Sequence, residues 1–515
     1  MGKHVFPDGF FIFVPLSIIF MQENHLPPIK IEKNDPKITR AWSFYDWANS
    51  VYSLVITSTI FPIYYTILTT KFNRKEFVEA ANEYQEIPVR HMIRIFGETY
   101  EPDAVLSFSY AISFFLVVLL SPFLSSLADT IGNKKSFLQF FCYLGATSCM
   151  GLAMFTGMNN VFLGLLFSIT ASVGFWGSLV FYNSFLPDIA TPDKQDELSA
   201  RGFIFGYIGS VVLLIICLFL IQGITDDPKE RNIWIRVTFL LTGAWWFGFA
   251  QYTFRHLPQF GNVKDNLPKD LVLLNYKNIF KRHKEQGGIF VVIKDNIRFY
   301  IDVAKESFRE LLKVGKNLFG DKNLKFFLSS FFFYSVGMQT IFLMATPFGS
   351  TMIFPKNDEK YKLIITILVI QIIAILGAFL FSRLSKKIGN KNVITIAVII
   401  WIFCCLTAFI LTKENPHLQT IFYILAGSIG LVMGGLQAMS RSTYSKLLPE
   451  NSQENTTFFS FYDVLEKLAI ITGMLIFSVF IQKFGNMQYA FIAMSAFFLI
   501  GAVLIRFVQL KSFRN

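Results

Sequence analysis

The chain has 515 residues, of which 53% are hydrophobic and only 16% are charged. Too little polar surface is available to cover a globular core of this size, so the composition excludes a water-soluble protein and indicates that lipid surrounds most of the chain. The formal net charge is +12. This excess lies between apolar stretches and not in a folded basic domain, which argues against nucleic acid as a partner and favours membrane lipid.

The start of the chain is polar apart from one short apolar run. Residues 10–20 are apolar over about eleven positions and include Pro15, which is shorter than the roughly 20 residues that cross a bilayer, and no small-residue cleavage site follows. We therefore interpret residues 1–41 as a cytoplasmic N-terminal segment. Met21 opens a charged stretch that leads directly into the first long apolar run, so we hypothesise that translation begins at Met21.

About twelve apolar stretches of roughly 18 to 25 residues follow, and each is long enough to cross a bilayer as a helix. In the first half of the chain they lie near residues 42–68, 104–127, 136–157, 160–184, 201–223 and 233–254. In the second half they lie near residues 326–346, 362–383, 392–412, 419–440, 457–482 and 487–508. The predicted fold is an all-α polytopic membrane protein with twelve transmembrane helices.

A polar segment separates the two sets of six stretches. Residues 255–325 carry about fifteen Lys/Arg and about eight acids, which predicts a basic central loop between an N-terminal half (42–254) and a C-terminal half (326–508), with a short tail at 509–515. Between Ile289 and Leu318, apolar residues recur at helical spacing among charged ones. This pattern fits either an amphipathic helix on the membrane surface or a solvated helix.

The distribution of basic residues predicts the orientation of the chain. If successive loops alternate between the two sides, about 33 of the 47 Lys/Arg lie on the side that carries both termini and the central loop. The positive-inside rule makes that side cytoplasmic. The longest loop on the other side, about residues 69–103, has slightly more acid than base and no Asn-x-Ser/Thr sequon, which favours a bacterial inner membrane.

Two motifs recur in the same order in both halves. LADTIGNKKSF (127–137) after the second stretch returns as LSKKIGNKNVI (384–394) after the eighth, an offset of 257 residues. YNSFLPD (182–188) at the end of the fourth stretch returns as YSKLLPE (444–450) at the end of the tenth, an offset of 262. Two matches at nearly equal offsets predict a parallel repeat of six helices, that is, two pseudo-symmetric halves.

The loop after the second stretch resembles the signature of the major facilitator superfamily, with a small residue, an acid, a glycine and a basic pair. Those places are taken here by Ser125, Asp129, Gly132, Lys134 and Lys135. Ser125 stands where glycine is usual. We expect Asp129 to lie against a neighbouring helix N-terminus or basic group and to hold the cytoplasmic side closed, with Lys134 and Lys135 as further gating candidates.

The acid is not repeated. In the second copy of the motif the acidic position is occupied by Lys386, so only the first half keeps the acidic contact that the signature predicts.

A second set of motifs is more specific. SFYDWANSVY (43–52), YNSFLPDIA (182–190), GGLQAMSRSTYSKLLPE (434–450) and FYDVLEK (461–467) together resemble the branch named for the vacuolar amino-acid effluxers linked to autophagy. The resemblance covers nearly the whole chain from Trp42 onward. It implies a twelve-helix transporter with amino-acid export as its best-known activity. Ser335 stands where an acid is expected in the seventh helix, so no proton or substrate role is carried over to it.

Polar residues form a stripe on the first predicted helix. At 100° per residue, Asp46, Asn49, Ser53 and Thr57 fall within an arc of about 100°. A carboxylate near the centre of a membrane helix costs about 2.5 to 3.5 kcal/mol, so Asp46 is expected to face an aqueous cavity or a partner. The alternatives are that Asp46 anchors the cytoplasmic helix end, or that the predicted helix boundary is misplaced.

Three charged residues share one face of the eleventh predicted helix. Asp463 and Lys467 form an i,i+4 pair, and Glu466 lies beside them. Either the three form a structural cluster at a cytoplasmic helix end, or Asp463 or Glu466 exchanges a proton as the halves move. All six histidines fall outside the predicted helices, so an intramembrane proton relay would use carboxylates.

By analogy with the superfamily, the first, fourth, seventh and tenth helices line a central cavity. The further candidate contacts for a substrate on these helices are Trp176, Asn183, Gln339, Gln437 and Arg441. A zwitterionic amino acid needs an anion site and a cation site, which Arg441 and Asp46 could supply. Arg441 could instead be a positive-inside anchor, and the uncharged residues could serve helix packing.

Three functional classes were compared. A secondary transporter of a small solute fits the two-halves plan, with an amino acid or related metabolite as the first candidate and a sugar or drug-like compound as the alternative. Protons or sodium are the candidate coupling ions. A membrane-embedded lipid-processing enzyme would need a catalytic cluster, and the sequence has no HExxH or GxSxG motif in its apolar stretches. A channel fits two moving halves less well. No cofactor, metal or nucleotide-binding loop is predicted.

Overall fold

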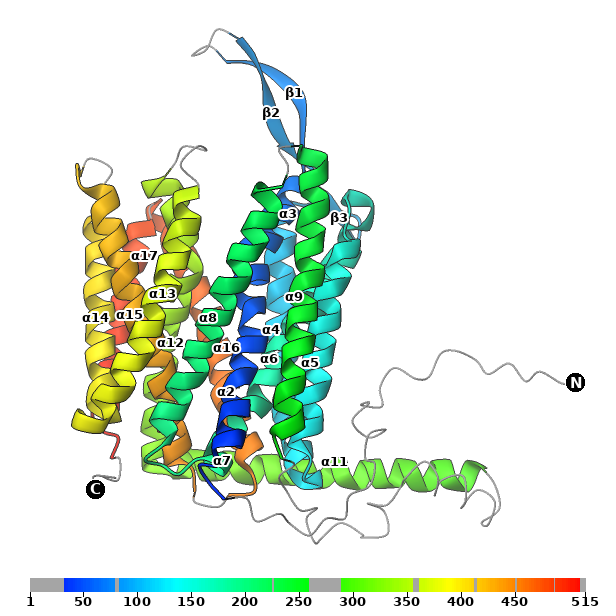
Figure 1. Cartoon of the computed structure of the whole chain (residues 1–515), viewed down its shortest axis with the longest axis vertical. Helices are drawn as coiled ribbons and strands as arrows, with labels where there is room; N and C mark the ends of the chain where they lie inside the picture. Colours follow the sequence, from blue (N-terminus) through cyan, green and yellow to red (C-terminus); the bar gives the residue numbers. More distant parts are fainter. Residues whose placement is uncertain are drawn as a thin grey trace, which may run out of the picture.

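The computed structural model describes residues 32–78, 83–224, 227–258, 289–354, 361–411, 415–449, 452–485 and 487–509. In these ranges twelve helices are long and apolar enough to cross a membrane, which confirms the predicted transmembrane plan. They stand side by side as one bundle (Figure 1). The chain is therefore an integral membrane protein. The proposed start at Met21 lies outside the described residues.

The N-terminal half supplies the first six spans. The first span consists of three consecutive segments, α2 (Pro36–Val51), the π-helix η1 (Tyr52–Ile60) and α3 (Phe61–Leu68). The remaining helices of this half are α4 (Pro102–Ile131), α5 (Lys134–Gly151) with η2 (Leu152–Met154), η3 (Met158–Asn160) with α6 (Val161–Ser184), α7 (Leu186–Ile189), α8 (Gln195–Gln222) and α9 (Pro228–His256).

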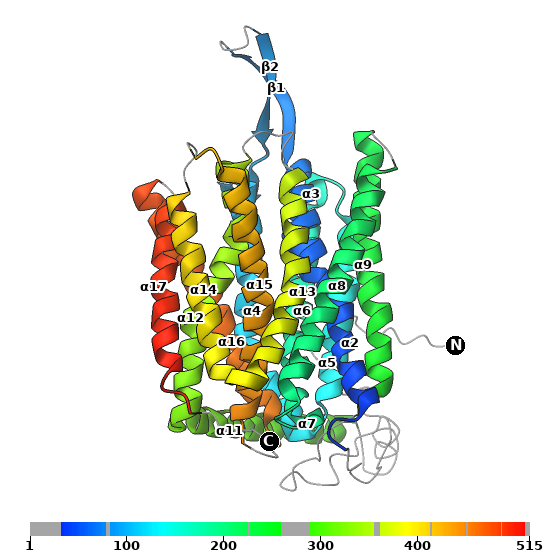
Figure 2. The ribbon, with the colours of Figure 1, turned by 60° about the vertical axis from the view of Figure 1, so that its left-hand side comes forward.

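The C-terminal half supplies the other six spans. Its helices are α12 (Lys322–Phe348) with η4 (Gly349–Ile353), α13 (Tyr361–Ile388), α14 (Asn390–Ile410), α15 (Leu418–Leu447), α16 (Asn455–Phe484) and α17 (Met487–Ile505). Each half encloses its own cluster of buried apolar side chains. The two halves stand beside each other, with α8 against α13 and α4 against α16 at the junction (Figures 1 and 2).

Several helices continue past the predicted apolar stretches into polar sequence. The second span was predicted to end near residue 127, yet α4 continues to Ile131, and the tenth was predicted to end near 440, yet α15 continues to Leu447. Backbone hydrogen bonds of a helix do not stop where the hydrocarbon ends, so these extensions cost little. As a result Asp129 and Arg441 lie on rigid helical turns.

Three glycines of the fifth span allow close packing. A Cβ atom at Gly206 would lie 2.5 Å from the hydroxyl of Ser50, and one at Gly209 would lie 2.7 Å from the carbonyl of Trp47. Gly202 likewise faces the first span. The small-residue spacing of α8 therefore brings its backbone directly against α2.

The segment predicted as a long polar loop, residues 69–103, contains two antiparallel hairpins. β1 (Thr70–Val78) pairs with β2 (Glu83–Arg90), and β3 (Ile93–Ile95) pairs with β4 (Glu98–Tyr100). The first hairpin projects beyond the bundle (Figure 1), and we call this the hairpin end. Outside the membrane the backbone N–H and C=O groups of a strand can form hydrogen bonds with a hairpin partner and with water, so strands are possible there. The purely α-helical prediction therefore holds for the spans only.

The central segment ends in one long helix. α11 (Ile289–Gly320) contains the predicted amphipathic stretch and lies across the end of the bundle opposite the hairpins (Figures 1 and 2). It contacts α4 of the N-terminal half and α12 and α16 of the C-terminal half. We call this the α11 end of the bundle.

The first span departs from regular helical spacing. From Tyr52 to Ile60 the hydrogen bonds follow the wider π pattern, and the hydroxyl of Thr59 donates to the carbonyl of Leu54, five residues back. The 100° spacing that aligned Ser53 and Thr57 with Asp46 therefore does not apply beyond Tyr52, where the wider π spacing sets the direction of each side chain.

Candidate functional site

The structure brings Asp46 and Arg441 together across the two halves. An Nη atom of Arg441 on α15 lies 3.4 Å from an Oδ atom of Asp46 on α2, and both side chains are about 95% buried. The Tyr182 hydroxyl donates to the same carboxylate at 2.8 Å, and Arg441 also donates to the side-chain carbonyl of Asn183 at 3.2 Å. We call these four residues the central ion pair cluster.

Other contacts satisfy the rest of the Arg441 guanidinium. Its Nε and Nη atoms donate to the hydroxyl and the carbonyl oxygen of Ser199 at 3.0 and 2.7 Å. The guanidinium carbon lies 4.2 Å from the ring centre of Phe203 and 4.9 Å from that of Trp42. A buried charge is tolerated when its donors are paired and aromatic faces surround it. Arg441 is thus held by three helices and does not reach toward lipid headgroups.

Asp129 lies at the N-terminus of α16, as the signature predicted. Its carboxylate accepts hydrogen bonds from the backbone N–H of Thr457 at 2.7 Å, from the Thr457 hydroxyl at 2.7 Å and from the backbone N–H of Thr456 at 3.3 Å. The first N–H groups of a helix have no partner within the helix and carry partial positive charge, so a carboxylate there is favourable. Asp129 thereby joins α4 to the opposite half.

The basic pair of the signature contributes through Lys134. Its ammonium group pairs with Asp188 and donates to the carbonyl of Ser184 at 3.1 Å. Asp188 in turn accepts from the side-chain amide of Asn455 at 2.7 Å, which extends the contact to α16. Lys135 is partly buried next to Lys134. Asp129, Lys134, Asp188 and Asn455 form what we call the α4 contact.

A matching contact, which the sequence analysis missed, joins α8 of the first half to the second half. Asp196 at the start of α8 accepts from the hydroxyl of Ser385 at 2.8 Å, from the amide of Asn390 at 2.7 Å and from the ammonium of Lys446 at 2.7 Å. These residues, with the neighbouring Glu197–Lys386 pair, form the α8 contact.

An offset of 260 residues, nearly that of the repeats, aligns the start of α8 at Gln195 with the start of α16 at Asn455. If QDELSA at the start of α8 had been compared with NTTFFS at the start of α16 in that register, the two acids in QDELSA would have indicated the α8 contact. Its acids, Asp196 and Glu197, stand on α8, which is the first-half counterpart of α16, the helix that Asp129 caps.

The central ion pair cluster, the α4 contact and the α8 contact all lie toward the same end of the bundle. Asp46 lies ten residues, about 15 Å, from the start of α2, and Arg441 lies six residues, about 9 Å, from the end of α15. In the described part of the chain, the hydrogen bonds that join the two halves lie nearer to the α11 end than to the hairpin end. Together the central ion pair cluster, the α4 contact and the α8 contact hold this end closed, and we call them the gate.

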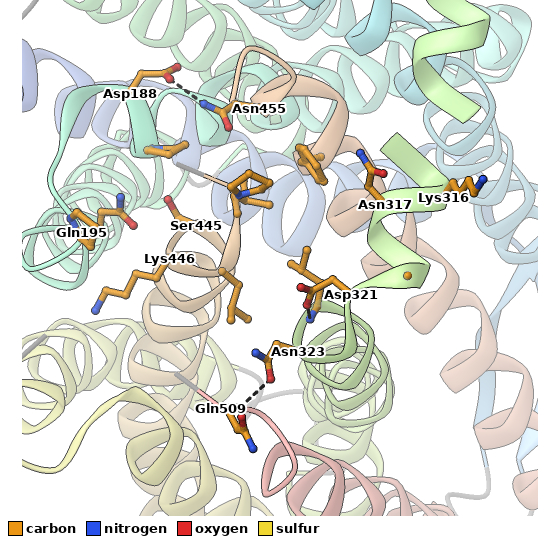
Figure 3. A pocket seen from close by; sticks show the side chains of 18 of the residues that line it. Asp188, Gln195, Lys316, Asn317, Asp321, Asn323, Ser445, Lys446, Asn455 and Gln509 are labelled. Atoms are coloured by element: carbon orange, nitrogen blue, oxygen red, sulfur yellow. Dashed lines mark hydrogen bonds between the residues drawn. The ribbon is translucent and has the colours of Figure 1, made fainter. Parts of the chain in front are cut away.

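A cavity of 1050 Å³ lies on the side of the gate that faces the α11 end of the bundle. Figure 3 shows the Asp188–Asn455 hydrogen bond at one edge of this cavity, with Gln195 and Lys446 at another. The end of α11 and the start of α12 form its opposite wall through Lys316, Asn317 and Asp321 (Figure 3). The cavity therefore reaches the gate from the α11 end and is lined by both halves.

The charged residues of α16 form a second buried cluster. Lys467 is completely buried and lies 2.5 Å from the carboxylate of Asp463 and 3.1 Å from that of Glu466. Its ammonium lies 3.7 Å from the ring centre of Trp176 on α6, and Glu466 accepts from the amide of Gln339 on α12 at 2.9 Å. We call these five residues the α16 cluster.

The α16 cluster is not at a helix end. Lys467 lies twelve residues, about 18 Å, from the start of α16, which is well inside the span. The cluster contains two carboxylates and one ammonium, and one carboxylate oxygen of Asp463 has no hydrogen-bond partner among the described residues. It can therefore take up one further positive charge.

The remaining uncharged candidates differ in their environment. Gln437 accepts a hydrogen bond from Tyr207 at 2.8 Å across the two halves. Ser53 is half-buried and donates to the carbonyl of Ser50. The Asn49 amide nitrogen and the Ser335 hydroxyl are buried without a hydrogen-bond partner in the described ranges. Of these uncharged candidates, Asn49 thus has unused hydrogen-bonding capacity, and so does Ser335, to which no role was carried over.

Comparison with known proteins agrees with the fold and the motifs. The family model described as "Vacuole effluxer Atg22 like" matches residues 34–197 and 191–515. The chain is 29% identical over 482 residues to the uncharacterized MFS-type transporter YxiO of Bacillus subtilis, covering 92% of this chain and 96% of that protein. It is 25% identical over 431 residues to autophagy-related protein 22 of Saccharomyces cerevisiae S288c, covering 77% and 76%.

Solved structures of low sequence identity share the fold. The proton:xylose symporter XylE superposes with a TM-score of 0.63 at 13% identity, covering 92% of this chain and 96% of that one. The transporter FucP in its outward conformation superposes with a TM-score of 0.58 at 11% identity, covering 93% and 99%. The family model and the name of YxiO both describe a transporter, which favours the transporter class over a lipid-processing enzyme. The chain is a transporter of the major facilitator superfamily and belongs to its Atg22-like family.

Proposed function

We propose that the protein exports a small solute, an amino acid or a related metabolite, by alternating access between the two sides of the membrane. The observation that carries this proposal is the buried Asp46–Arg441 pair across the two halves. The family description as an effluxer supports export as the direction, and the resemblance of the sequence motifs to the vacuolar amino-acid effluxers supports an amino acid as the class to test first.

The charge pair also suggests what the solute is. Opening the α11 end must separate Asp46 from Arg441, and an unpaired buried charge costs about 3 to 5 kcal/mol. A zwitterion offsets this cost, because its ammonium group replaces Arg441 beside Asp46 and its carboxylate replaces Asp46 beside Arg441. A neutral sugar offers neither charge. The pair therefore favours a zwitterionic solute over the alternative of a sugar or drug-like compound.

For the orientation, we propose that the α11 end and both termini are cytoplasmic and that the host membrane is a bacterial inner membrane. The positive-inside distribution and the basic central segment support this. Labelling of intact cells with an impermeant maleimide tests it, using Glu98→Cys at the hairpin end and Lys316→Cys at the α11 end, both exposed positions. We expect label on Glu98→Cys alone, and label on Lys316→Cys alone would reverse the orientation and with it the proposed direction.

We propose a proton as the coupling ion and the α16 cluster as its site. Two carboxylates beside one ammonium leave one negative charge uncompensated inside the membrane, and a proton on Glu466 or Asp463 neutralises it. Trp176 of the other half covers Lys467, so movement of the halves changes the exposure of the cluster. A sodium ion at the same place is the alternative.

The test uses purified protein in liposomes preloaded with mixed amino acids, and in a parallel set preloaded with mixed sugars. Release is measured with and without a pH gradient for native protein, Asp46→Asn and Glu466→Gln. We expect native release that responds to the gradient, no release for Asp46→Asn, and gradient-independent release for Glu466→Gln. Release that follows a sodium gradient instead would assign sodium, and release of sugars but not amino acids would remove the zwitterion proposal while leaving the gate intact.

A further inference from the structure

A shallow hollow of 510 Å³ lies where the span α4 meets α11, away from the gate and the α16 cluster. Its lining consists of Phe123 from α4 and of Ile301, Ala304, Lys305, Phe308 and Arg309 from α11. The lining thus combines apolar side chains with two basic ones. This combination matches the two parts of a phospholipid, an acyl chain and an anionic headgroup.

The fixed contacts of α11 define which of its faces is free. Ser307, Val314 and Leu318 are buried, and the carbonyl of Ser307 accepts a hydrogen bond from the Ser126 hydroxyl of α4 at 2.6 Å. At 100° per residue, this docked face is about 120° away from the stripe formed by Ile301, Phe308, Leu312 and Phe319. The stripe is therefore separate from the contact with the bundle.

That stripe is exposed in the structure. Phe308, Leu312 and Phe319 have 54, 60 and 68% of their surface accessible. Large apolar side chains on a free helix face mark a surface that another apolar phase covers. Exposed apolar residues of α4 at i, i+4, i+7 and i+11 form the lipid-facing side of that span, and they lead toward Phe123 in the hollow: Phe108, Ile112, Phe115 and Leu119. The α11 stripe thus continues the bundle's lipid-facing surface.

Charge decides which lipid fits. Residues 255–325 carry fifteen Lys/Arg and eight acids, and the charged residues that line the hollow are both basic. The side chain of Arg309 is 76% exposed, and its ion pair within the described part of the chain is with the partly buried Glu306 at 3.3 Å, so it can turn toward a phosphate. We propose that the hollow between α4 and α11 binds an anionic phospholipid, with its acyl chain against Phe123 and Phe308 and its headgroup against Lys305 and Arg309, and that α11 lies in the membrane interface.

The test places a fluorescent probe on single cysteines in lipid nanodiscs. Phe308→Cys carries the probe in the hollow, and Lys313→Cys carries it on the polar face of the same helix. The five native cysteines are buried, so unsubstituted protein treated with the same reagent is the blank. Nanodiscs contain phosphatidylcholine with either brominated phosphatidylglycerol or brominated phosphatidylcholine in equal share, because bromine quenches a nearby probe.

We expect bromine to quench the Phe308→Cys probe and not the Lys313→Cys probe, and phosphatidylglycerol to quench more than phosphatidylcholine. Each basic residue near an anionic surface strengthens binding about fivefold. The change of Lys305→Gln with Arg309→Gln should therefore abolish the preference for phosphatidylglycerol, whereas Lys322→Gln with Lys325→Gln on α12 should keep it.

Equal quenching at positions 308 and 313, or no headgroup preference in the native background, would overturn the proposal. A Phe308→Cys probe that is shielded from water in detergent and insensitive to brominated lipid would also overturn it, because a second copy or another protein would then cover the stripe.

Discussion

Lys386 pairs with Glu197 at 2.8 Å across the two halves. Lys386 occupies the position in the second copy of the motif that Asp129 occupies in the first, so the charge at this position is reversed between the halves. What the two contacts share is a carboxylate at a helix start. Asp129 reaches the N-terminus of α16 from another helix, while Glu197 and Asp196 belong to the first turn of α8 itself. The positive end of a helix is thus neutralised in both halves, which relates the two contacts more closely than residue identity does.

Reversing the Glu197–Lys386 pair tests this relationship. We expect Glu197→Lys to weaken closure of the α11 end, because two lysines then face each other at a helix N-terminus. Adding Lys386→Glu should restore part of the loss, by less than about 1 kcal/mol since both side chains are roughly half exposed. Thermal melting of the purified protein and amino-acid release from liposomes measure the effect. A double variant no better than Glu197→Lys would remove the pair from the gate.

Asp129→Asn keeps a hydrogen-bond acceptor but removes the charge. Because the carboxylate accepts two backbone N–H groups of α16, we expect a loss of about 0.3 to 2 kcal/mol in the stability of the closed α11 end. Asp103→Asn in the first turn of α4 is the matched control, since it removes an acid at a helix start at the hairpin end. Ser445, in the wall of the cavity on the α11 side of the gate, is only 3% exposed, so increased labelling of Ser445→Cys measures opening. An equal increase in labelling for both variants would contradict a gating role for Asp129.

Gly202 faces the central ion pair cluster directly. A Cβ atom there would lie 2.5 Å from the Asp46 carboxylate and 3.0 Å from both Arg441 and the Tyr182 hydroxyl. We expect Gly202→Ala to displace these groups at a cost of about 1 to 3 kcal/mol, and to slow transport. Gly248→Ala on α9, where no atom lies within 4 Å of the new methyl group, should leave the melting temperature and transport unchanged. Native activity in Gly202→Ala would mean that the pair is not needed for transport.

The sequence was sufficient for the transmembrane plan because hydrophobic length and the internal repeat are strong, local patterns. It also indicated a helix N-terminus as one of two expected partners of Asp129, the other being a basic group. The pairing of Asp46 with Arg441 was proposed only as two charges for one substrate, since contacts 395 residues apart depend on how the halves dock. Asp196 was missed because its partners come from three helices of the other half, and the π-helix after Val51 has no sequence pattern that distinguishes it from α-helix.

The charges of the α16 cluster predict which of two variants, Glu466→Gln or Lys467→Met, is the more stable. Glu466→Gln leaves the neutral Asp463–Lys467 pair, so we expect native stability or better. Lys467→Met leaves two buried carboxylates without their cation, which should cost about 3 to 5 kcal/mol. Thermal melting across a range of pH measures both. The Lys467→Met variant should regain stability as the pH falls, because protonation removes the buried charge. If Glu466→Gln were the less stable of the two, the cluster would not carry an excess negative charge.

Lipid composition should affect transport through α11. The helix touches both halves at the α11 end, through the Ser126–Ser307 hydrogen bond to α4 and through Gly315, which faces the ring of Phe461 of α16. An anionic lipid that fixes α11 in the interface therefore stabilises the closed α11 end, and we expect transport to slow as phosphatidylglycerol replaces phosphatidylcholine in the liposomes. The Lys305→Gln, Arg309→Gln variant should respond less, while Lys322→Gln with Lys325→Gln should respond as native protein does. If both variants and native protein slowed equally, the lipid effect would arise from the bulk membrane and not from α11.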